Sequence, residues 1–282
     1  MDRRDWISAV RLAVAESRCG GEYPTPLLWF NETMLGKDFY LKKYGNDLED
    51  EARWLEYGAV FKANSVETLL RRHAIQPRTL LELGSGTGAV IRECQRRGLA
   101  DEYIAVDASE DAIAWAQERS PGIKCMVADI TDPKFQLIHS VDAVVLSHVL
   151  EHLECPGDFL ASLVARVPFS WLIAEVPLED LLAARMKNLI RDRTKNRAGH
   201  VQFFTAQSFL TLLTSAGLEV VDSLRYVQVF GEEMLESQIE RLSFPLGKRV
   251  VMRMTQRHLP RLFKPLWSRL YHAHYAVLCR IA

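Results

Sequence analysis

The chain lacks a strong net charge, a paired-cysteine motif and any long apolar run. Its formal net charge is −1 over 282 residues, so no overall electrostatic field favours nucleic-acid binding. The five cysteines are scattered without a CxxC pair, which is typical of reduced thiols. No run approaches the ~18 to 20 apolar residues of a membrane-spanning helix, and the first residues, broken by Arg11 and Glu16, lack a signal-peptide core. We therefore expect a cytoplasmic protein.

The chain also lacks internal repeats and low-complexity segments, so the hydrophobic pattern defines its organisation. Residues 1–75 are aromatic-rich, with a helical pattern over Leu48–Arg72 that Pro77 ends. From Thr79 onward, short apolar runs alternate with amphipathic stretches, which predicts a parallel sheet with helical crossovers. The predicted strands are Thr79–Leu83, Tyr103–Asp107, Lys124–Ala128, Ala143–Ser147, Trp171–Val176, Leu218–Leu224 and His274–Ile281. The predicted helices are Ala89–Arg97, Ala112–Glu118, Pro156–Ala165 and Ala206–Ala216.

This pattern divides the chain into four parts. We expect a helical N-terminal cap over residues 1–75 and a nucleotide-binding core over residues 76–225. A helical basic insertion would occupy residues 226–270, and residues 271–282 would return to the sheet as its last strand.

The most specific motif is the stretch Leu80-Leu-Glu-Leu-Gly-Ser-Gly-Thr-Gly88. It predicts a buried strand with the carboxylate of Glu82 near its end, a turn with three glycines, and then a helix. Glycine lets the backbone turn sharply and lets a ligand approach the main chain without a Cβ in the way. The start of the following helix offers unpaired N–H groups. The motif therefore indicates a nucleotide site.

Acidic residues stand at the ends of the strands that follow. Asp107 closes the second strand about 20 residues after the glycines, where a carboxylate can bind ribose hydroxyls. Asp129 closes the third strand, near the expected adenine. Asp142 opens the fourth strand, which ends at Ser147 and His148. We assign all three acids to the ligand-binding edge of the sheet.

Together these motifs resemble the class I S-adenosylmethionine-dependent methyltransferases, in their small-molecule branch. The resemblance also includes Ser147-His-Val-Leu-Glu-His-Leu153 and Gly199-His-Val-Gln-Phe-Phe-Thr205, and it covers about residues 60–225. It implies an α/β fold: a Rossmann-like seven-stranded sheet of order 3-2-1-4-5-7-6, mostly parallel with strand 7 antiparallel, and helices on both faces. The rival dinucleotide motif GxGxxG fits less well, because the third glycine comes one residue early.

The resemblance implies a set of cofactor-binding residues. The glycines would line the methionine part of S-adenosylmethionine, Glu82 would support the loop, Asp107 would bind ribose and Asp129 adenine. The full expected set is Glu82, Gly84, Ser85, Gly86, Gly88, Asp107, Ala108, Asp129, Ile130, Ser147 and His148. The product of transfer would be S-adenosylhomocysteine.

Two histidines are candidate catalytic residues. His148 would face the acceptor beside the sulfonium, and His200 is a candidate general base for a hydroxyl acceptor. The stretch from His148 to His152 also matches the zinc motif HxxEH, in which both imidazoles would share a helix face. Its position just after a parallel strand argues against that motif, so we expect no metal. His200 follows a basic loop over residues 185–197, which raises the alternative of an anionic substrate.

The substrate pocket is expected to involve the N-terminal cap. Tyr40, Trp54 and Tyr57 are candidate lid residues, Lys62 a candidate for the cofactor carboxylate, and Glu175 a candidate to position the acceptor. Core packing remains the alternative for the aromatic residues. The expected acceptor is a small molecule methylated on O or N, which includes anionic, natural-product or glycan-related compounds. A non-catalytic regulatory or scaffold protein that binds the cofactor is the alternative in a different class.

No acidic residue follows Glu240, although residues 241–282 carry nine lysines and arginines. Apolar residues are interleaved with these cations over 241–270. The segment is either a lid with a basic outer face, a subunit contact in a homodimer, or a weak membrane-surface contact. The last alternative would make the protein a peripheral membrane methyltransferase for a lipid-linked substrate. The chain has no NPPY-like tetrad after the fourth strand, so we expect no nucleic-acid substrate.

Overall fold

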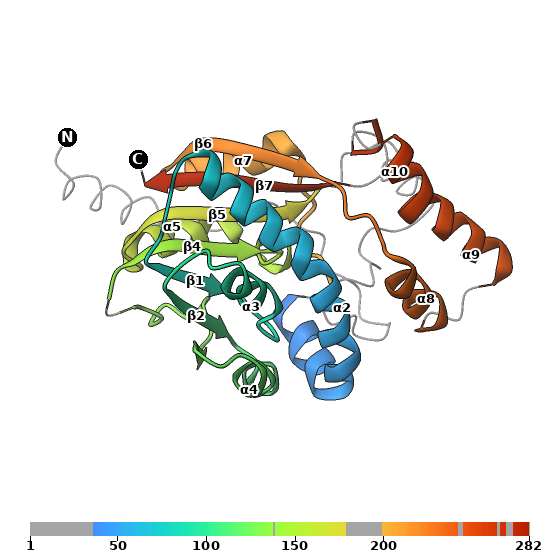
Figure 1. Cartoon of the computed structure of the whole chain (residues 1–282). Coiled ribbons are helices and arrows are strands. Elements are labelled where there is room, and N and C mark those ends of the chain that lie inside the picture. The colour runs from blue at the N-terminus through green and yellow to red at the C-terminus, as the bar shows by residue number, and fades with distance from the viewer. Residues whose placement is uncertain are drawn as a thin grey trace, which may run out of the picture.

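A seven-stranded sheet forms the centre of the computed structural model, with helices on both faces (Figure 1). The model describes residues 36–137, 139–178, 199–241, 245–263, 266–268 and 273–281. The strand order is β3-β2-β1-β4-β5-β7-β6, and β7 runs antiparallel to both of its neighbours. The expected sheet order and orientation are therefore confirmed. The strands are β1 Thr79–Leu83, β2 Glu102–Asp107, β3 Ile123–Val127, β4 Val141–Ser147, β5 Phe169–Pro177, β6 Leu218–Tyr226 and β7 His274–Ile281.

Each face of the sheet has its own apolar core. On one face α5 (Pro156–Arg166) and α7 (Ala206–Ser215) pack through side chains such as Leu160 and Phe209. On the other face α2 (Gly36–Arg72) and α3 (Ala89–Arg96) contribute Leu69 and Ile91. The central strands β1 and β4 are buried along almost their whole length and are mostly apolar, because both faces of the sheet are covered. The helix α4 (Glu110–Arg119) follows β2 and begins with Ser109 as its N-cap.

The helix α2 is longer than its sequence pattern predicts. The pattern supports a helix from Leu48 to Arg72, but the helix begins at Gly36. Asp47 interrupts it with non-helical dihedrals (φ −137°, ψ 39°), which changes the direction of the chain. The residues before this break therefore follow a different axis, and Tyr40 and Tyr44 reach the carboxyl edge of the sheet. Residues 1–35 of the expected cap lie outside the described part of the chain.

The segment between β6 and β7 extends away from the sheet as a group of helices (Figure 1). It contains α8 (Glu232–Arg241), α9 (Leu246–Arg253), the π turn η3 (Met254–His258) and α10 (Leu259–Leu262). The chain then returns as β7, so the predicted strand His274–Ile281 is confirmed. Among the helices that the model describes, none is long and apolar enough to cross a membrane.

Candidate functional site

The turn after β1 requires three glycines. Gly84, Gly86 and Gly88 have φ values of 72°, 53° and 70°, in the left-handed region that disfavours other residues. A Cβ on Gly84 would lie 2.6 Å from the Val149 side chain, and one on Gly86 would lie 2.4 Å from the Tyr44 hydroxyl. These glycines therefore let the loop pass close to its neighbours. A Cβ on Gly88 would instead meet the Ala116 Cβ at 3.0 Å, so this glycine serves helix packing.

A cavity of about 800 Å³ opens beside this loop at the carboxyl edge of the sheet. Ten of the residues expected to bind the cofactor line it: Glu82, Gly84, Ser85, Gly86, Asp107, Ala108, Asp129, Ile130, Ser147 and His148. Gly88 is not among them. The expected substrate residues Tyr40, Trp54 and His200 also line the cavity, together with Lys62. Tyr57 borders a separate hollow of about 290 Å³, and Glu175 lies behind the wall.

Asp107 and Asp129 are fixed by neighbouring donors. Asp107 accepts the N–H of Gly86 at 2.7 Å and that of Ser109 at 2.9 Å, so it ties the glycine loop to β2. Burial raises the pKa of Asp107, although these N–H groups oppose the shift. Asp129 accepts the N–H and the hydroxyl of Thr131 through one oxygen. Both carboxylates therefore have defined positions on the cavity wall.

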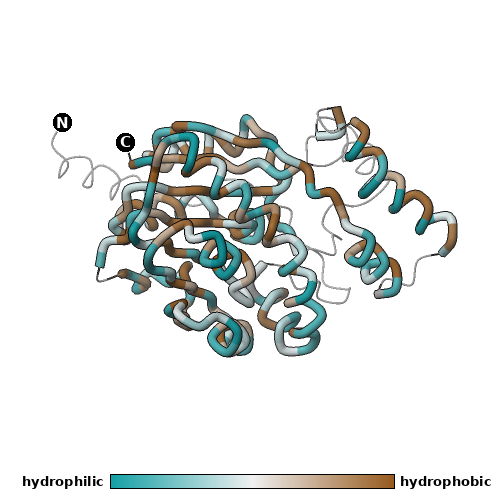
Figure 2. Tube along the Cα trace, viewed as in Figure 1, coloured by the Kyte–Doolittle hydropathy of each residue, from teal (hydrophilic) through white to brown (hydrophobic). Residues whose placement is uncertain are grey.

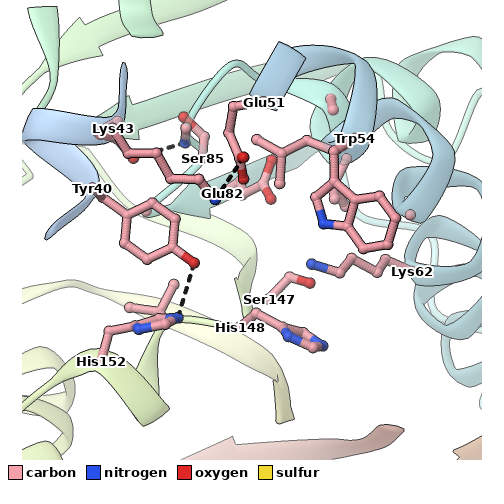
Figure 3. Close-up of a pocket in the computed structure, with 18 of the residues that line it drawn as sticks. Tyr40, Lys43, Glu51, Trp54, Lys62, Glu82, Ser85, Ser147, His148 and His152 are labelled. Carbon is pink, nitrogen blue, oxygen red and sulfur yellow. Dashed lines mark hydrogen bonds and ion pairs between the residues drawn. The ribbon is translucent and has the colours of Figure 1, made fainter. Parts of the chain in front are cut away.

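Glu82 is a buried carboxyl group that lies on the cavity wall (Figure 3). One of its oxygens accepts the N–H of Ile91 in the first turn of α3, at 2.9 Å. Burial raises the pKa of Glu82 to about 8, although attraction to the ammonium of Lys62 and the Ile91 bond oppose the shift. A cation bound beside Glu82 would therefore favour the ionised carboxylate and lower its pKa toward neutral pH.

His148 lies between two buried carboxylates. Its backbone has φ 59°, a left-handed conformation that is uncommon outside glycine. Nδ1 lies 3.1 Å from Glu151, while Nε2 lies 3.3 Å from Glu175 and 2.8 Å from Nδ1 of His274. Burial and the Lys62 charge disfavour the imidazolium, but the two carboxylates outweigh both and raise the pKa of His148. This geometry can hold a proton that His148 receives.

Glu175 supports His148 from β5. Its oxygens accept the hydroxyl of Ser65 and the hydroxyl of Tyr226, each at 2.7 Å. Burial would raise the pKa of this carboxyl group, but the contacts with His148 and Lys62 lower it overall. Glu175 is therefore an ionised, well-anchored partner of His148.

A second group forms around His152 (Figure 3). Its Nδ1 donates to the Gly199 carbonyl at 3.2 Å, so Nε2 accepts the hydroxyl of Tyr40 at 3.4 Å. Burial lowers the pKa of His152 to about 4, and the imidazole is neutral. The N–H groups of Val201 and Gln202 donate to the backbone carbonyl of Glu151, which fixes the loop after Gly199. The loop therefore brings His200 to a ring distance of 5.0 Å from His152.

One sequence-based reading needs correction. Asp142 opens β4, so it lies at the opposite edge of the sheet, where it accepts the N–H groups of Arg78 and Thr79 at 2.9 Å. It therefore ties β4 to β1 and does not bind the ligand. His148 and His152 do not share a helix face, because His148 is left-handed and only Leu150–His152 form a short 3₁₀ turn.

The two histidines of the HxxEH match enter different groups. Among the described residues, the ligand atoms of His148, Glu175 and His274 lie within 4.8 Å of one another. The same holds for Glu151, His152 and His200. Within each group, hydrogen bonds or ion pairs join the side chains to one another. That the reaction needs no metal stays a prediction.

Several site residues were not found from the sequence. Glu151 is part of the HxxEH match but was given no role, and only the pairing of β5 with β7 brings His274 beside His148. Tyr44 was read as part of an aromatic-rich segment, although its hydroxyl lies against Gly86. Gln228 and Gln256 line the cavity from beyond β6, where the sequence has no recognisable motif. The basic loop of residues 185–197 lies outside the described residues.

Comparison with known proteins identifies relatives of this arrangement. A family model described as "Methyltransferase domain" matches residues 54–223. A trans-aconitate 2-methyltransferase from Mycolicibacterium gilvum is 28% identical over 166 residues, which are 55% of this chain and 63% of the relative. The matched region thus spans less than two thirds of that relative's length.

Solved structures share the fold. A SAM-dependent methyltransferase from Thermotoga maritima aligns with a TM-score of 0.55 and 14% identity, over 87% of this chain and 99% of its own. The plantazolicin methyltransferase BamL, solved with a substrate analogue and SAH, aligns with a TM-score of 0.53 and 14% identity, over 87% and 97% of the two chains.

Proposed function

The chain belongs to the methyltransferase-domain family, and we propose that it transfers a methyl group from S-adenosylmethionine to an oxygen of an anionic small molecule. The observation that carries this proposal is the joint lining of one cavity. Its wall includes the glycine loop with Asp107 and Asp129 as well as His148 and Lys62. Residues suited to the cofactor and residues suited to the acceptor thus line the same cavity.

The cofactor would lie along the ends of β1, β2 and β3. We propose that Gly84 and Gly86 contact its methionine part, Asp107 its ribose and Asp129 its adenine. Ser85, Ala108 and Ile130 would complete the wall around it. Glu82 would face the amino group of the cofactor, because an ammonium favours an ionised carboxylate in a buried site.

The acceptor would lie beside His148 and Lys62. Lys62 is half-buried on the cavity wall, and it lies close enough to Glu175 and His148 to lower the pKa of both groups. Its ammonium would bind a carboxylate or phosphate of the acceptor. The name of the Mycolicibacterium gilvum relative refers to trans-aconitate, a polycarboxylate, which supports an anionic acceptor. Tyr40, Trp54 and His200 would form further walls, whereas Tyr57 lies outside this cavity.

When bound, S-adenosylmethionine would supply an activated methyl group: a lone pair of the acceptor oxygen would form a bond to the methyl carbon while the carbon–sulfur bond breaks and its electron pair stays on sulfur, which leaves neutral S-adenosylhomocysteine. If the acceptor is a hydroxyl, its proton would pass to neutral His148. Glu151 beside Nδ1 and Glu175 beside Nε2 would then stabilise the imidazolium. Glu175 acts through His148 as a positioning residue. The cavity would hold the two reactants in alignment.

The test is turnover with purified enzyme and a panel of hydroxyl and carboxyl acceptors, each with and without a second anionic group. Lys62→Met is expected to raise the KM for anionic acceptors more than the KM for neutral acceptors. The comparison is made at saturating S-adenosylmethionine, because the loss of Lys62 also raises the pKa of Glu82. Lys42, which is exposed on the same helix and does not line the cavity, provides the matched control variant Lys42→Met. An equal rise of KM for neutral acceptors, or no rise at all, would contradict the proposed anionic acceptor.

A lipid-linked acceptor is the second candidate. Phe230, Gln238 and Gln256 of the segment between β6 and β7 form part of the cavity wall. The same segment exposes apolar side chains such as Leu246 and Leu262, which favours this candidate. Turnover of an acceptor only when it carries an acyl or polyprenyl chain would support this candidate over the first. A homodimer stays a prediction.

A further inference from the structure

A continuous helical rod over residues 246–262 combines α9, η3 and α10 and carries an uncovered apolar stripe. Leu246 is 78% exposed, Val250 55% and Leu262 72%, and Met254 is also exposed. No residue of α9 is buried. Most of the large apolar side chains that are exposed in the described chain belong to this rod or follow it directly: Leu246, Val250, Val251, Met254, Leu262, Phe263 and Leu266. Figure 2 shows apolar and polar residues alternating along this projecting segment.

The π turn keeps this stripe on one side of the rod. Leu246, Val250 and Met254 recur every four residues, and each such step in an α-helix advances the side chain by about 40°. The wider turn of η3 reverses part of this advance before Leu262. The four side chains therefore share one face instead of spiralling around the helix.

The rod is held against the protein at one edge of the stripe and on its far side. At the edge, Arg253 and Arg257 form ion pairs with Glu236 and Glu232 of α8. Met252 packs against the apolar cluster that includes Phe230 and Ile239, and the indole of Trp267 donates to the Thr255 carbonyl at 3.0 Å. The rod thus has a fixed inner side, and its apolar stripe faces outward.

Positive charge accompanies the stripe. Arg249 and Arg261 are exposed, and together with Arg253 and Arg257 they recur every four residues along one edge of the stripe. Residues 241–282 contain nine lysines and arginines and no acidic residue, although the whole chain has a net charge of −1. An apolar stripe flanked by cations matches a surface that offers acyl chains below anionic headgroups.

We propose that the outer face of this rod docks on anionic phospholipid bilayers, with Leu246, Val250, Met254 and Leu262 entering the boundary between headgroups and acyl chains. This proposal does not depend on the identity of the acceptor, because the docking surface is the rod and not the catalytic cavity. Gln256 of η3 lines the cavity from the inner side of the same rod, so docking would place this wall next to the bilayer.

Vesicle co-sedimentation of the full chain tests the docking. The protein is expected to sediment with vesicles of phosphatidylcholine mixed with phosphatidylglycerol, and much less with phosphatidylcholine alone. Arg249→Gln with Arg261→Gln is expected to weaken binding roughly 30-fold, because each cation near an anionic surface contributes about 1 kcal/mol. Val250→Asp with Val251→Asp should abolish sedimentation. The matched control is Val60→Asp, which places the same change at a similarly exposed position on α2.

Cofactor affinity, measured by calorimetry, confirms that each variant is folded and separates docking from catalysis. Failure of the wild-type protein to sediment with the anionic vesicles would overturn the proposal. So would equal sedimentation of the Val250→Asp/Val251→Asp and Val60→Asp variants. Light scattering provides the remaining outcome: a dimer that dissociates on Val250→Asp with Val251→Asp would assign the stripe to a second copy of the chain and overturn lipid docking.

Discussion

The ionisation of Glu82 predicts a pH dependence of cofactor binding. Burial raises the pKa of this carboxyl group to about 8, so it is protonated in the free enzyme at neutral pH. A cofactor ammonium bound beside Glu82 would favour the carboxylate and lower its pKa again. Binding then requires an ionised Glu82 and a protonated amino group, and α-amino groups have a pKa of about 7.7 to 8.0.

The size of the effect follows from the two pKa values. With both near 8, the affinity for S-adenosylmethionine is greatest close to pH 8 and falls on both sides. At pH 6 only about one percent of Glu82 is ionised in the free enzyme, so the affinity is expected to be roughly 20-fold weaker than at pH 8. Isothermal titration calorimetry between pH 6 and 9, at constant ionic strength, measures this profile.

Glu82→Gln is the matched variant, because it keeps the shape of the side chain and removes its ionisation. It is expected to bind the cofactor more weakly at pH 8 and to lose the decline toward pH 6. A wild-type affinity that stays constant from pH 6 to 8 would refute the reasoning, as would a Glu82→Gln variant with an unchanged decline.

Three further perturbations test other parts of the site. Gly86→Ala should lower the free energy of unfolding in urea by about 2 to 5 kcal/mol, because alanine is strained at a left-handed φ and its Cβ would clash with the Tyr44 hydroxyl. Removing that hydroxyl with Tyr44→Phe in the same chain should recover about 1 to 3 kcal/mol. Additive losses in the double variant would contradict this. His148→Asn should lower kcat on hydroxyl acceptors about 10²- to 10⁴-fold and leave the cofactor Kd unchanged. Glu151→Gln removes a carboxylate that raises the pKa of His148, so the acid limb of the kcat/KM profile should shift to lower pH. Asp142→Ala should cost about 1 to 3 kcal/mol of stability and leave the cofactor Kd unchanged, since it loses only two backbone bonds at the far edge; a weaker Kd would contradict this.

The ionisation of Glu82 also makes the free energy of unfolding depend on pH. In the absence of cofactor, the pKa of Glu82 is higher in the folded protein than its ordinary value of 4.5. Folding then retains a proton that the unfolded chain loses, so this group destabilises the fold progressively as the pH rises from about 4.5 to 8. The cofactor should offset this loss.

The sheet and the cofactor edge were predictable because they depend on short segments. Strands buried on both faces read as apolar runs, and parallel strands bring their carboxyl ends to the same edge, so Asp107 and Asp129 could be placed from sequence. The same rule, applied with care, excludes Asp142, which stands at the start of its strand and not at its end.

The acceptor side was less predictable because it depends on long-range pairing. His274 reaches His148 only through the register of β5 with β7, which lie almost a hundred residues apart in the chain. Tyr40 reaches His152 because α2 changes direction at Asp47. Gly45 and Asn46 directly before it are a weak break signal, but they do not predict the direction that the chain takes. Helix and strand propensities of short segments cannot predict either contact.

A crystal structure of the protein with S-adenosylhomocysteine tests the central claim most directly. The account predicts the homocysteine part beside Gly84 and Gly86, the ribose within hydrogen-bonding distance of Asp107, and the sulfur facing the His148 side of the cavity. A cofactor bound elsewhere, or one in the cavity with its ribose away from Asp107 and its sulfur turned from His148, would contradict it.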